Sequence, residues 1–232
     1  MHQFMLFGNV PLERHNQVMS IIAGVSATQP TPYAEQHALF EPQHTAAVTD
    51  SNVIGTKRKP QLNANQQRYV NDVNRDMDYE TYAPTTNWKL TIKEEPEAGS
   101  PNLISQPYTS FDTVDWQKYL NPVGFKYGNS QVWRGHYFVH GNVVLKVFRV
   151  LLPKTEIQQP LGNMPPKKEE LEYLDPSGAY IIEACVRVED RKDSSLTDVA
   201  TKELLDVQKL LQGSVPLIAP DRLALDTRVR GD

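Results

Sequence analysis

The segment that most constrains the fold is residues 124–152, which read GFKYGNSQVWRGHYFVHGNVVLKVFRVLL. This pattern predicts two long strands joined by a tight turn at residues 140–142, because glycine and asparagine tolerate the positive φ that hairpin turns require. The second strand is apolar on both faces. Such a strand needs a packed layer beneath it and a cover above it, either a helix, a barrel interior or another protein. One face carries Val143, Leu145 and Val147, and the other carries Val144, Phe148 and Val150.

Length and composition fit one globular domain with many polar loops. The chain has 232 residues, of which 39% are hydrophobic and 17 are prolines. Single β-barrels and sandwiches commonly reach this length as one domain. The net charge of −4 argues against a general nucleic-acid-binding surface.

Cysteine usage and hydropathy indicate an intracellular protein. Cys185 is the only cysteine, so an intrachain disulfide is excluded and a thiolate zinc site lacks its other ligands. The apolar run at the N-terminus is too short for a signal peptide, and no segment approaches the roughly 20 apolar residues of a membrane span. We therefore expect no membrane association.

Periodicity and turn residues predict a mainly β fold with flanking helices, of the α+β class, in which hairpin connections make the strands antiparallel. Besides the hairpin, the predicted strands are 1–9, 37–42, 46–53, 88–93, 102–110 and 179–188. The predicted helices are 11–23, a short helix capped by Asp112 or Thr113 and running through Leu120, and 195–212. The last helix carries an apolar stripe of Leu196, Val199, Ala200, Leu204, Val207, Leu210 and Leu211.

Two segments are too polar to belong to a core. Residues 54–86 are rich in Asn, Gln, Asp and Arg and have few aliphatic side chains, so burial would offset too little of their ordering entropy. We predict a mobile insertion there and a Pro/Lys-rich loop at 154–172. The basic run Lys57-Arg58-Lys59 fits a nuclear import signal or an ordinary solvated charge run, and the sequence leaves both readings open.

The chain carries no short motif of catalysis or nucleotide binding. His136 and His140 are four residues apart, which suits a metal pair on a helix, but on a strand this spacing separates them by roughly 13 Å. The acidic pairs at 94–95 and 169–170 lie in loops, where nothing buries them and shifts their pKa values. We therefore predict no catalytic, cofactor-binding or metal-binding residue.

The candidate binding feature is the second strand of the hairpin. Lys146 and Arg149 interrupt its two apolar faces, so we expect one face to be only partly covered within the monomer. An exposed apolar strip with a charged rim marks a protein–protein contact. The helix 195–212 is a second candidate, although such a stripe more often covers its own sheet. The candidate partner-binding residues are Val143, Leu145, Val147 and Arg149.

Three collinear stretches resemble the Mediator subunit 18 family, in particular its fungal form. They are MHQFMLFGNVP…VMSIIAGVSATQP near the start, GFKY…VWRGHYFVHGNVVLKVFRVLLP in the hairpin, and SLTDVATKELLDVQKLLQGSVPL followed by DRLALDTRV near the end. Together they cover roughly half to two-thirds of the chain in the family's order. The resemblance marks Gly135, His136, Phe138, Gly141, Asn142 and Phe148 as structural signature residues.

The resemblance implies that residues 1–232 form one closed, many-stranded antiparallel β-barrel with packed helices, similar to the tunnel of metal-dependent RNA triphosphatases. It implies a non-enzymatic subunit of the Mediator head module, a nuclear transcription coregulator that bridges regulators and RNA polymerase II. The implied partners are Mediator subunit 20 in a heterodimer, the C-terminal helix of subunit 8 and other head-module subunits. The resemblance implies no cofactor, no membrane and no sequence-specific nucleic acid.

The resemblance to the triphosphatase tunnel suggests an alternative function for the chain, that of a metal-dependent RNA 5′-triphosphatase. Such a tunnel needs acidic side chains at alternate strand positions that converge on a divalent ion. The nearest candidates are Glu183 and Glu94, and neither lies in a Glu-x-Glu pair, so the ligand set is missing. A lumen for apolar ligands is disfavoured as well, because we expect the face of strand 179–188 with Glu183 and Arg187 to point inward.

Overall fold

The fold is an antiparallel sheet closed into a barrel. The computed structural model describes residues 1–42, 69–98, 102–113, 115–155 and 167–228. Every strand pairing in these ranges is antiparallel. The strands are β1 (His2–Val10), β2 (Thr31–Pro42), β3 (Asn71–Met77), β4 (Trp88–Lys93), β5 (Ile104–Thr113), β6 (Phe125–His140), β7 (Val143–Pro153), β8 (Leu171–Tyr173) and β9 (Tyr180–Val188).

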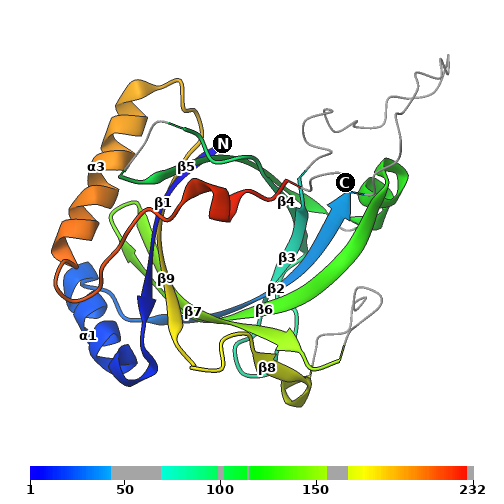
Figure 1. The fold of residues 1–232 in the computed structure, drawn as a ribbon, viewed down its shortest axis with the longest axis horizontal. Helices are drawn as coiled ribbons and strands as arrows, with labels where there is room; N and C mark the ends of the chain where they lie inside the picture. Colours follow the sequence, from blue (N-terminus) through cyan, green and yellow to red (C-terminus); the bar gives the residue numbers. More distant parts are fainter. Residues whose placement is uncertain (43–68, 99–101, 114, 156–166, 229–232) are drawn as a thin grey trace.

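All the described strands except β8 form a closed ring. Its order is β6-β2-β3-β4-β5-β1-β9-β7, and the pairing of β7 with β6 completes it. The short β8 adds to β7 beside the ring, and Figure 1 looks along the barrel. Closure gives each ring strand two neighbours and leaves no long open edge. The predicted closed antiparallel barrel with flanking helices is therefore confirmed.

The α-helices in the described ranges are α1 (His15–Ser26), α2 (Gln117–Leu120) and α3 (Ser194–Leu210). Figure 1 shows α1 and α3 against the same part of the barrel wall, outside β1. None of the described helices combines the length and the apolar character that a membrane crossing requires. Single 3₁₀ turns occupy Leu12–Arg14, Asn121–Val123, Lys168–Glu170 and Arg222–Leu225.

The doubly apolar strand is β7, and its outer face lies beneath the helices. Val143, Leu145 and Val147 are fully buried there, in one cluster with Ile22 of α1 and Leu204 of α3. Burial of such side chains is worth about 1.5–3 kcal/mol each, which makes this cluster a major stabilising contact. The helices therefore supply the outer cover that the sequence pattern demands.

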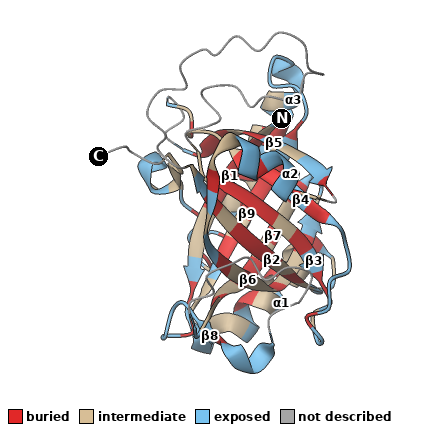
Figure 2. Cartoon of the chain, turned by 90° about the vertical axis from the view of Figure 1, so that its right-hand side faces the viewer, coloured by how far each residue is buried: buried red, intermediate tan, exposed pale blue. Residues whose placement is uncertain are grey.

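The inner face of β7 points into the barrel. Lys146 borders a central cavity, and Phe148 stacks on Trp133 of β6 with 4.8 Å between ring centroids. β9 divides in the same way, with apolar residues in the outer cluster and with Glu183 and Arg187 on the cavity wall. The prediction that the charged face of β9 points inward is confirmed. Figure 2 shows the buried residues in bands along the strands.

The predicted insertion at 54–86 is wrong over its second part. Residues 71–77 form β3, which pairs with β2 on one side and β4 on the other. The error has a physical cause, because alternate side chains of β3 face a polar lumen. Asp72 and Asn74 border that lumen and give the segment a composition unlike a core strand. Outside the described residues lie the predicted strand at 46–53, the basic run at 57–59 and the rest of the insertion up to residue 68.

The loop predicted at 154–172 also ends in regular structure. Residues 168–170 form a 3₁₀ turn, and Leu171 begins β8. Residues 156–166 lie outside the described residues. Leu171 is buried against the barrel, which explains why a strand forms at the end of a charged segment.

Two helices start later than the sequence pattern predicts. A 3₁₀ turn follows Pro11, so α1 begins only at His15, and it continues beyond Gly24 to Ser26. The pairing of β5 with β4 continues to Thr113, which delays α2. In both cases the structure of the preceding residues decides where the helix begins, and the periodic pattern alone does not reveal it.

α3 begins at Ser194 because Asp193, and not Ser195, is its N-cap. The Asp193 carboxylate accepts the backbone N–H groups of Ser195 at 3.0 Å and Leu196 at 3.3 Å. The predicted apolar stripe is wider than the face that meets the barrel. Ala200, Leu204, Val207 and Leu211 are buried, whereas Leu196, Val199 and Leu210 are about half exposed.

The C-terminal segment crosses one end of the barrel, as the red chain in Figure 1 shows. Ile218 and Phe7 of β1 exchange backbone hydrogen bonds of 2.8 Å. Farther along, the Thr227 hydroxyl donates to the carbonyl oxygen of Lys93 at 3.1 Å. Leu225 lies between these anchors and packs with the cluster around Met5, whose side chain also borders the cavity. The segment therefore covers part of one end of the lumen.

Two positions of the hairpin require glycine for different reasons. A Cβ at Gly135 would lie 2.0 Å from the Val147 carbonyl oxygen and 2.6 Å from the Phe148 Cα, so only glycine lets β6 and β7 approach this closely. Gly141 has φ +60°, the left-handed conformation that the two-residue turn requires. The predicted hairpin and its turn are confirmed.

We predict that Gly135→Ala lowers the free energy of unfolding by about 3 kcal/mol, because the new methyl group forces the β6 and β7 backbones apart. Urea denaturation of the two proteins measures this difference. Gly24→Ala is the matched control, since nothing lies within 4 Å of a Cβ there, and it should leave stability unchanged or raise it by about 1 kcal/mol. Equal stability of the two variants would contradict the close approach.

Candidate functional site

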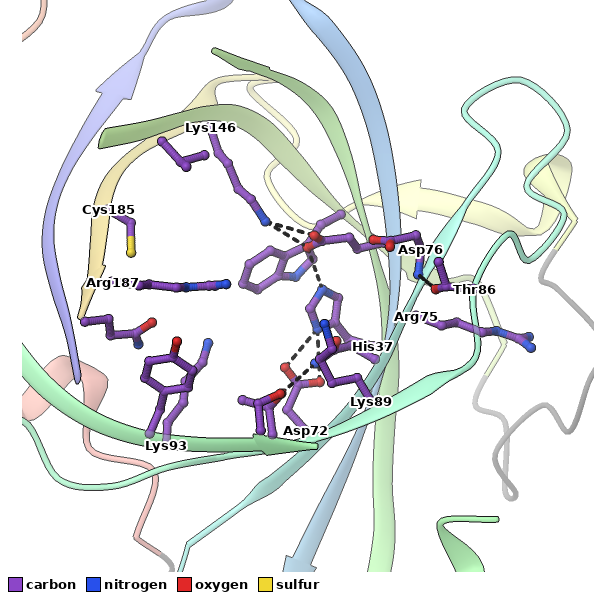
Figure 3. A pocket seen from close by; sticks show the side chains of 18 of the residues that line it. His37, Asp72, Arg75, Asp76, Thr86, Lys89, Lys93, Lys146, Cys185 and Arg187 are labelled. Carbon is purple, nitrogen blue, oxygen red and sulfur yellow. Dashed lines mark hydrogen bonds and ion pairs between the residues drawn. The ribbon is translucent and has the colours of Figure 1, made fainter. Parts of the chain in front are cut away.

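The barrel encloses a polar cavity of about 1240 Å³. Figure 3 shows side chains from several strands pointing into it, with Arg75 directed away from it. Acidic and basic groups both line the wall, so the lumen is suited neither to an apolar ligand nor to a strongly charged one. The acidic residues are Glu35, Asp72, Asp76, Asp112 and Glu183, and the basic residues that enter are Lys89, Lys93, Lys146 and Arg187.

Three of these side chains, Lys146, Glu35 and Asp72, form a continuous charge network with His37 across the lumen, which we call the lumen network. The Lys146 ammonium donates to the two Glu35 carboxylate oxygens at 2.9 and 3.2 Å. His37 Nε2 lies 3.5 Å from Glu35 Oε2, and His37 Nδ1 lies 3.0 Å from both oxygens of Asp72. The network joins β7, β2 and β3, as the dashed lines in Figure 3 show.

Burial and neighbouring charge set the protonation of this network. Burial of the His37 ring disfavours its charged form, but Asp72 and Glu35 outweigh burial and raise the pKa of His37 to about 9. Burial alone would raise the pKa of Glu35, yet His37 and Lys146 hold that pKa well below its usual range. The pKa of Asp72 is lowered against burial by His37. At neutral pH the network therefore holds two cations and two anions that compensate one another.

Aromatic rings pack around the lumen network. The centroid of the Trp133 ring lies 4.2 Å from that of His37, and the same ring stacks on Phe148. The Lys146 ammonium lies 4.9 Å from the centroid of Tyr33. These rings restrict the histidine and the lysine to one arrangement, so the network acts as a rigid cross-link between strands.

The acidic candidates of the enzymatic alternative are not brought together. Glu183 lies on the cavity wall, whereas Glu94 follows the end of β4 and is not among the described residues that line the cavity. Within the described ranges, no group of three or more His, Cys, Asp and Glu side chains is arranged to hold a metal ion. Burial raises the pKa of the Cys185 thiol to about 12, so it is not a nucleophilic thiolate at neutral pH.

The predicted partner-binding strip is wrong for three of its four residues. Val143, Leu145 and Val147 present no exposed surface, because α1 and α3 cover them. The pattern showed that the face needs a cover but did not show that the chain's own helices provide it. Arg149 differs, since it is only partly buried and its guanidinium stacks on two tyrosine rings.

The remaining signature residues hold the hairpin in place. Phe138 is buried in the cluster beneath the helices. Asn142 donates its backbone N–H at 3.2 Å and its side-chain amide at 3.1 Å to the carboxylate of Glu203, which ties the turn to α3. His136 lies on the outer face of β6, with its ring centroid 5.5 Å from that of Tyr79.

Sequence reasoning missed the lumen network. A signal was present in β2, where Glu35 and His37 alternate with Ala34 and Ala38, which are buried on the other face. Asp72 was not predicted to join this network, because the sequence of its segment resembles a polar insertion. The network is therefore visible only once the strands are placed side by side.

Comparison with known proteins decides the family. A family model described as Med18 protein matches residues 2–228. The chain belongs to the Med18 family. Med18 relatives include Mediator of RNA polymerase II transcription subunit 18 from Neosartorya fischeri, which is 24% identical over 269 residues and aligns over 99% of this chain and 100% of its own length. The Aspergillus fumigatus protein of the same name is 25% identical over 283 residues, with 99% and 100% coverage.

A solved structure shares the Med18 barrel. A chain in the structure of the Schizosaccharomyces pombe Mediator head module aligns with a TM-score of 0.69 at 15% identity, over 95% of this chain and 99% of that chain. A Hippeastrum protein described as having a dominant triphosphatase activity aligns with a TM-score of only 0.40 at 8% identity. That value is too low to support any inference about chemistry in this Med18 chain.

We predict that the free energy of unfolding falls as the pH rises from about 6.5 to about 9. His37 binds its proton more tightly in the folded chain, with a pKa raised from 6.5 to about 9. Its contribution is therefore complete below the unfolded pKa and is lost as the pH passes the folded one. The loss is on the order of 3 kcal/mol. Urea denaturation across this pH range at constant ionic strength measures it.

The control for this profile is a pair of histidine variants. His37→Gln should lower stability overall and flatten the decline between these pH values, because the titrating group is gone. His140→Gln, in the hairpin turn, should keep the decline of the unmodified chain. A pH-independent stability of the unmodified chain over this range would show that the lumen network does not hold a proton.

Proposed function

We propose that this chain is a non-enzymatic subunit of the Mediator head module that regulates RNA polymerase II transcription through protein–protein contacts. The observation that carries the proposal is the Med18 family match across residues 2–228. It is supported by relatives named Mediator of RNA polymerase II transcription subunit 18 and by the fold shared with a head-module chain. The proposed location is the nucleus.

The barrel suits a scaffold that binds through its outer surface. The charges of the lumen network compensate one another, so its carboxylates are already engaged by Lys146 and His37. Closure of the ring fixes the positions of the outward-facing side chains. Rigid surfaces lose little conformational entropy on binding, which favours stable association.

The proposed partners are a Mediator subunit 20 homologue, in a heterodimer, and the C-terminal helix of Mediator subunit 8. Other head-module subunits and the RNA polymerase II machinery extend these contacts. The family resemblance supports both partners. The uncovered side of α3 supports a helical partner in particular, because Leu196, Val199 and Leu210 are 49%, 52% and 54% exposed at helical spacing.

The alternative function, a metal-dependent phosphohydrolase, has no favouring observation. The lumen carboxylates of Glu35 and Asp72 are already occupied by Lys146 and His37. Release of phosphate from a triphosphate-ended RNA in the presence of Mn²⁺, abolished by Glu183→Ala, would establish this alternative and overturn the proposal.

We predict that the chain, co-expressed with the subunit 20 homologue and the subunit 8 C-terminal segment, elutes with both in size-exclusion chromatography at micromolar concentration. Val199→Glu should weaken retention of the helical segment at least tenfold, because it places a charge on the uncovered apolar side of α3. The matched control is Lys202→Glu, at an exposed position of the same helix. Separate elution of the unmodified chain from both partners would count against the proposal.

A further inference from the structure

Two arginines on the outer wall of the barrel face each other without a carboxylate partner. Arg134 of β6 and Arg149 of β7 are register partners in the strand pair. Neither belongs to an ion pair within the described part of the chain. Like charges directly opposite one another destabilise a strand pair. An anion between the two guanidinium groups would therefore relieve the repulsion between them.

Aromatic rings hold both guanidinium groups in position. Arg134 Cζ lies 3.8 Å from the ring centroid of Tyr79. Arg149 Cζ lies 4.0 Å from the centroid of Tyr173 and 4.5 Å from that of Tyr180. Stacking occupies the flat face of a guanidinium and leaves its N–H edge free for a planar anion.

A small hollow lies between the two arginines, and buried nitrogen atoms around it lack partners. Arg134 Nε and His136 Nδ1 have no hydrogen-bond partner in the described chain. The same holds for His15 Nε2, whose ring stacks on Tyr180 at 3.9 Å. Buried polar atoms without partners are uncommon in folded proteins. The hollow is lined by Tyr79, Arg134, Gly135, His136, Arg149, Leu151, Tyr173 and Tyr180.

One wall of the hollow comes from a constrained loop after β3. The Asp78 carboxylate accepts the N–H groups of Glu80 and Thr81 and also the Thr81 hydroxyl. Tyr82 is buried with φ +60°, a conformation that a non-glycine residue keeps only when its surroundings enforce it. The loop therefore holds Tyr79 against the arginine before any ligand arrives, which lowers the entropic cost of binding.

We propose that this hollow, between Arg134 and Arg149, binds a carboxylate side chain from an acidic and partly apolar segment of a partner protein. The proposal rests on the binding function proposed above and identifies one site at which a partner would be bound. Two guanidinium groups offer the paired planar donors that a carboxylate accepts. The electrostatics of the whole chain disfavour a nucleic acid in this place, because a net charge of −4 repels a polyanion.

Apolar side chains at the rim explain why the segment is also partly apolar. Tyr173, which stacks on the Arg149 guanidinium, is 42% exposed, and the next residue, Leu174, is 56% exposed. Leu12 is 50% exposed, and its side chain and Arg149 both come close to Gly178. Residues that flank the bound carboxylate would pack on this rim and exclude water from the charged contact.

His136 lines the hollow and His15 stacks on Tyr180 of its wall, and burial together with nearby positive charge lowers the pKa of both histidines. Burial lowers the pKa of His136, and His15 and Arg134 lower it further. Burial also lowers the pKa of His15; the hydrogen bond that His15 Nδ1–H donates to the Asn16 side-chain oxygen opposes this shift, and Arg149 reinforces it. A bound carboxylate would favour the charged imidazole, so the pKa of His136 should rise when the hollow is filled.

The test uses the full chain and two C-terminally amidated peptides that carry the same uncharged fluorophore, Asp-Leu-Asp-Phe and its neutral counterpart Asn-Leu-Asn-Phe. Fluorescence anisotropy should show at least tenfold tighter binding of the acidic peptide, since charge-assisted hydrogen bonds are the main contact. The double substitution Arg134→Gln with Arg149→Gln should remove this preference. Arg187→Gln, in the lumen, is the matched control and should leave it unchanged. NMR titration of the His136 ring should show the rise in its pKa only with the acidic peptide.

Equal affinity of the unmodified chain for the two peptides would overturn the proposal, and so would an unchanged preference in the double variant. Binding of a single-stranded RNA in preference to the acidic peptide, lost in the same variant, would also overturn it. Urea denaturation separates binding from folding, because removal of two like charges should leave stability unchanged or higher. A chain that co-elutes with the subunit 20 homologue but shows no preference for the acidic peptide refutes this site and leaves the proposed function intact.

Discussion

The pairing of β6 with β7 is the contact on which the other features of the molecule depend. It closes the ring and gives β6 its second neighbour. Its outer face is the floor on which α1 and α3 pack. Its inner face brings Lys146 to Glu35, a residue 111 positions away in the chain. The close approach at Gly135 shows how tightly the two strands are joined.

The inner and outer faces of the β6–β7 pair differ in whether their charged side chains have oppositely charged neighbours. Inside the barrel, each charge of the lumen network has an oppositely charged neighbour, and the network stabilises the wall. Outside, Arg134 and Arg149 face each other with tyrosine rings as their contacts. This contrast between the compensated lumen network and the two outer arginines supports the proposal that this Med18 chain binds partners through its outer surface. The Glu183 and Glu94 candidates do not reverse this, because they are not brought together.

Local patterns predicted much of the fold. The hairpin turn, the alternation of β9 and the strand Trp88–Lys93 all follow from neighbours in the sequence, and all are confirmed. β3 was missed because a strand that faces a polar lumen lacks the aliphatic pattern of a core strand. The partner strip on β7 was misassigned because periodicity shows that a face is apolar but not what covers it. Both errors concern contacts between distant segments, which local pattern does not encode.

The arginine hollow and the lumen network show the same limit, because local sequence predicts only those of their contacts that lie within the hairpin. The opposition of Arg134 and Arg149 follows from the turn, since the pairing of His140 with Val143 fixes every earlier partner. The tyrosines that hold these arginines come from three distant segments and could not be foreseen. The same is true of the lumen network, in which His37 and Asp72 meet only because β2 and β3 are adjacent.

The chain's own helices and its own lumen cover both faces of β7. Native-state amide hydrogen exchange of the isolated chain at residues 143–148 measures this cover. We expect these amides to exchange only through global unfolding, with protection equal to the full free energy of unfolding. Exchange at the rate of exposed loops in the isolated chain, with slowing only after a partner is added, would contradict it.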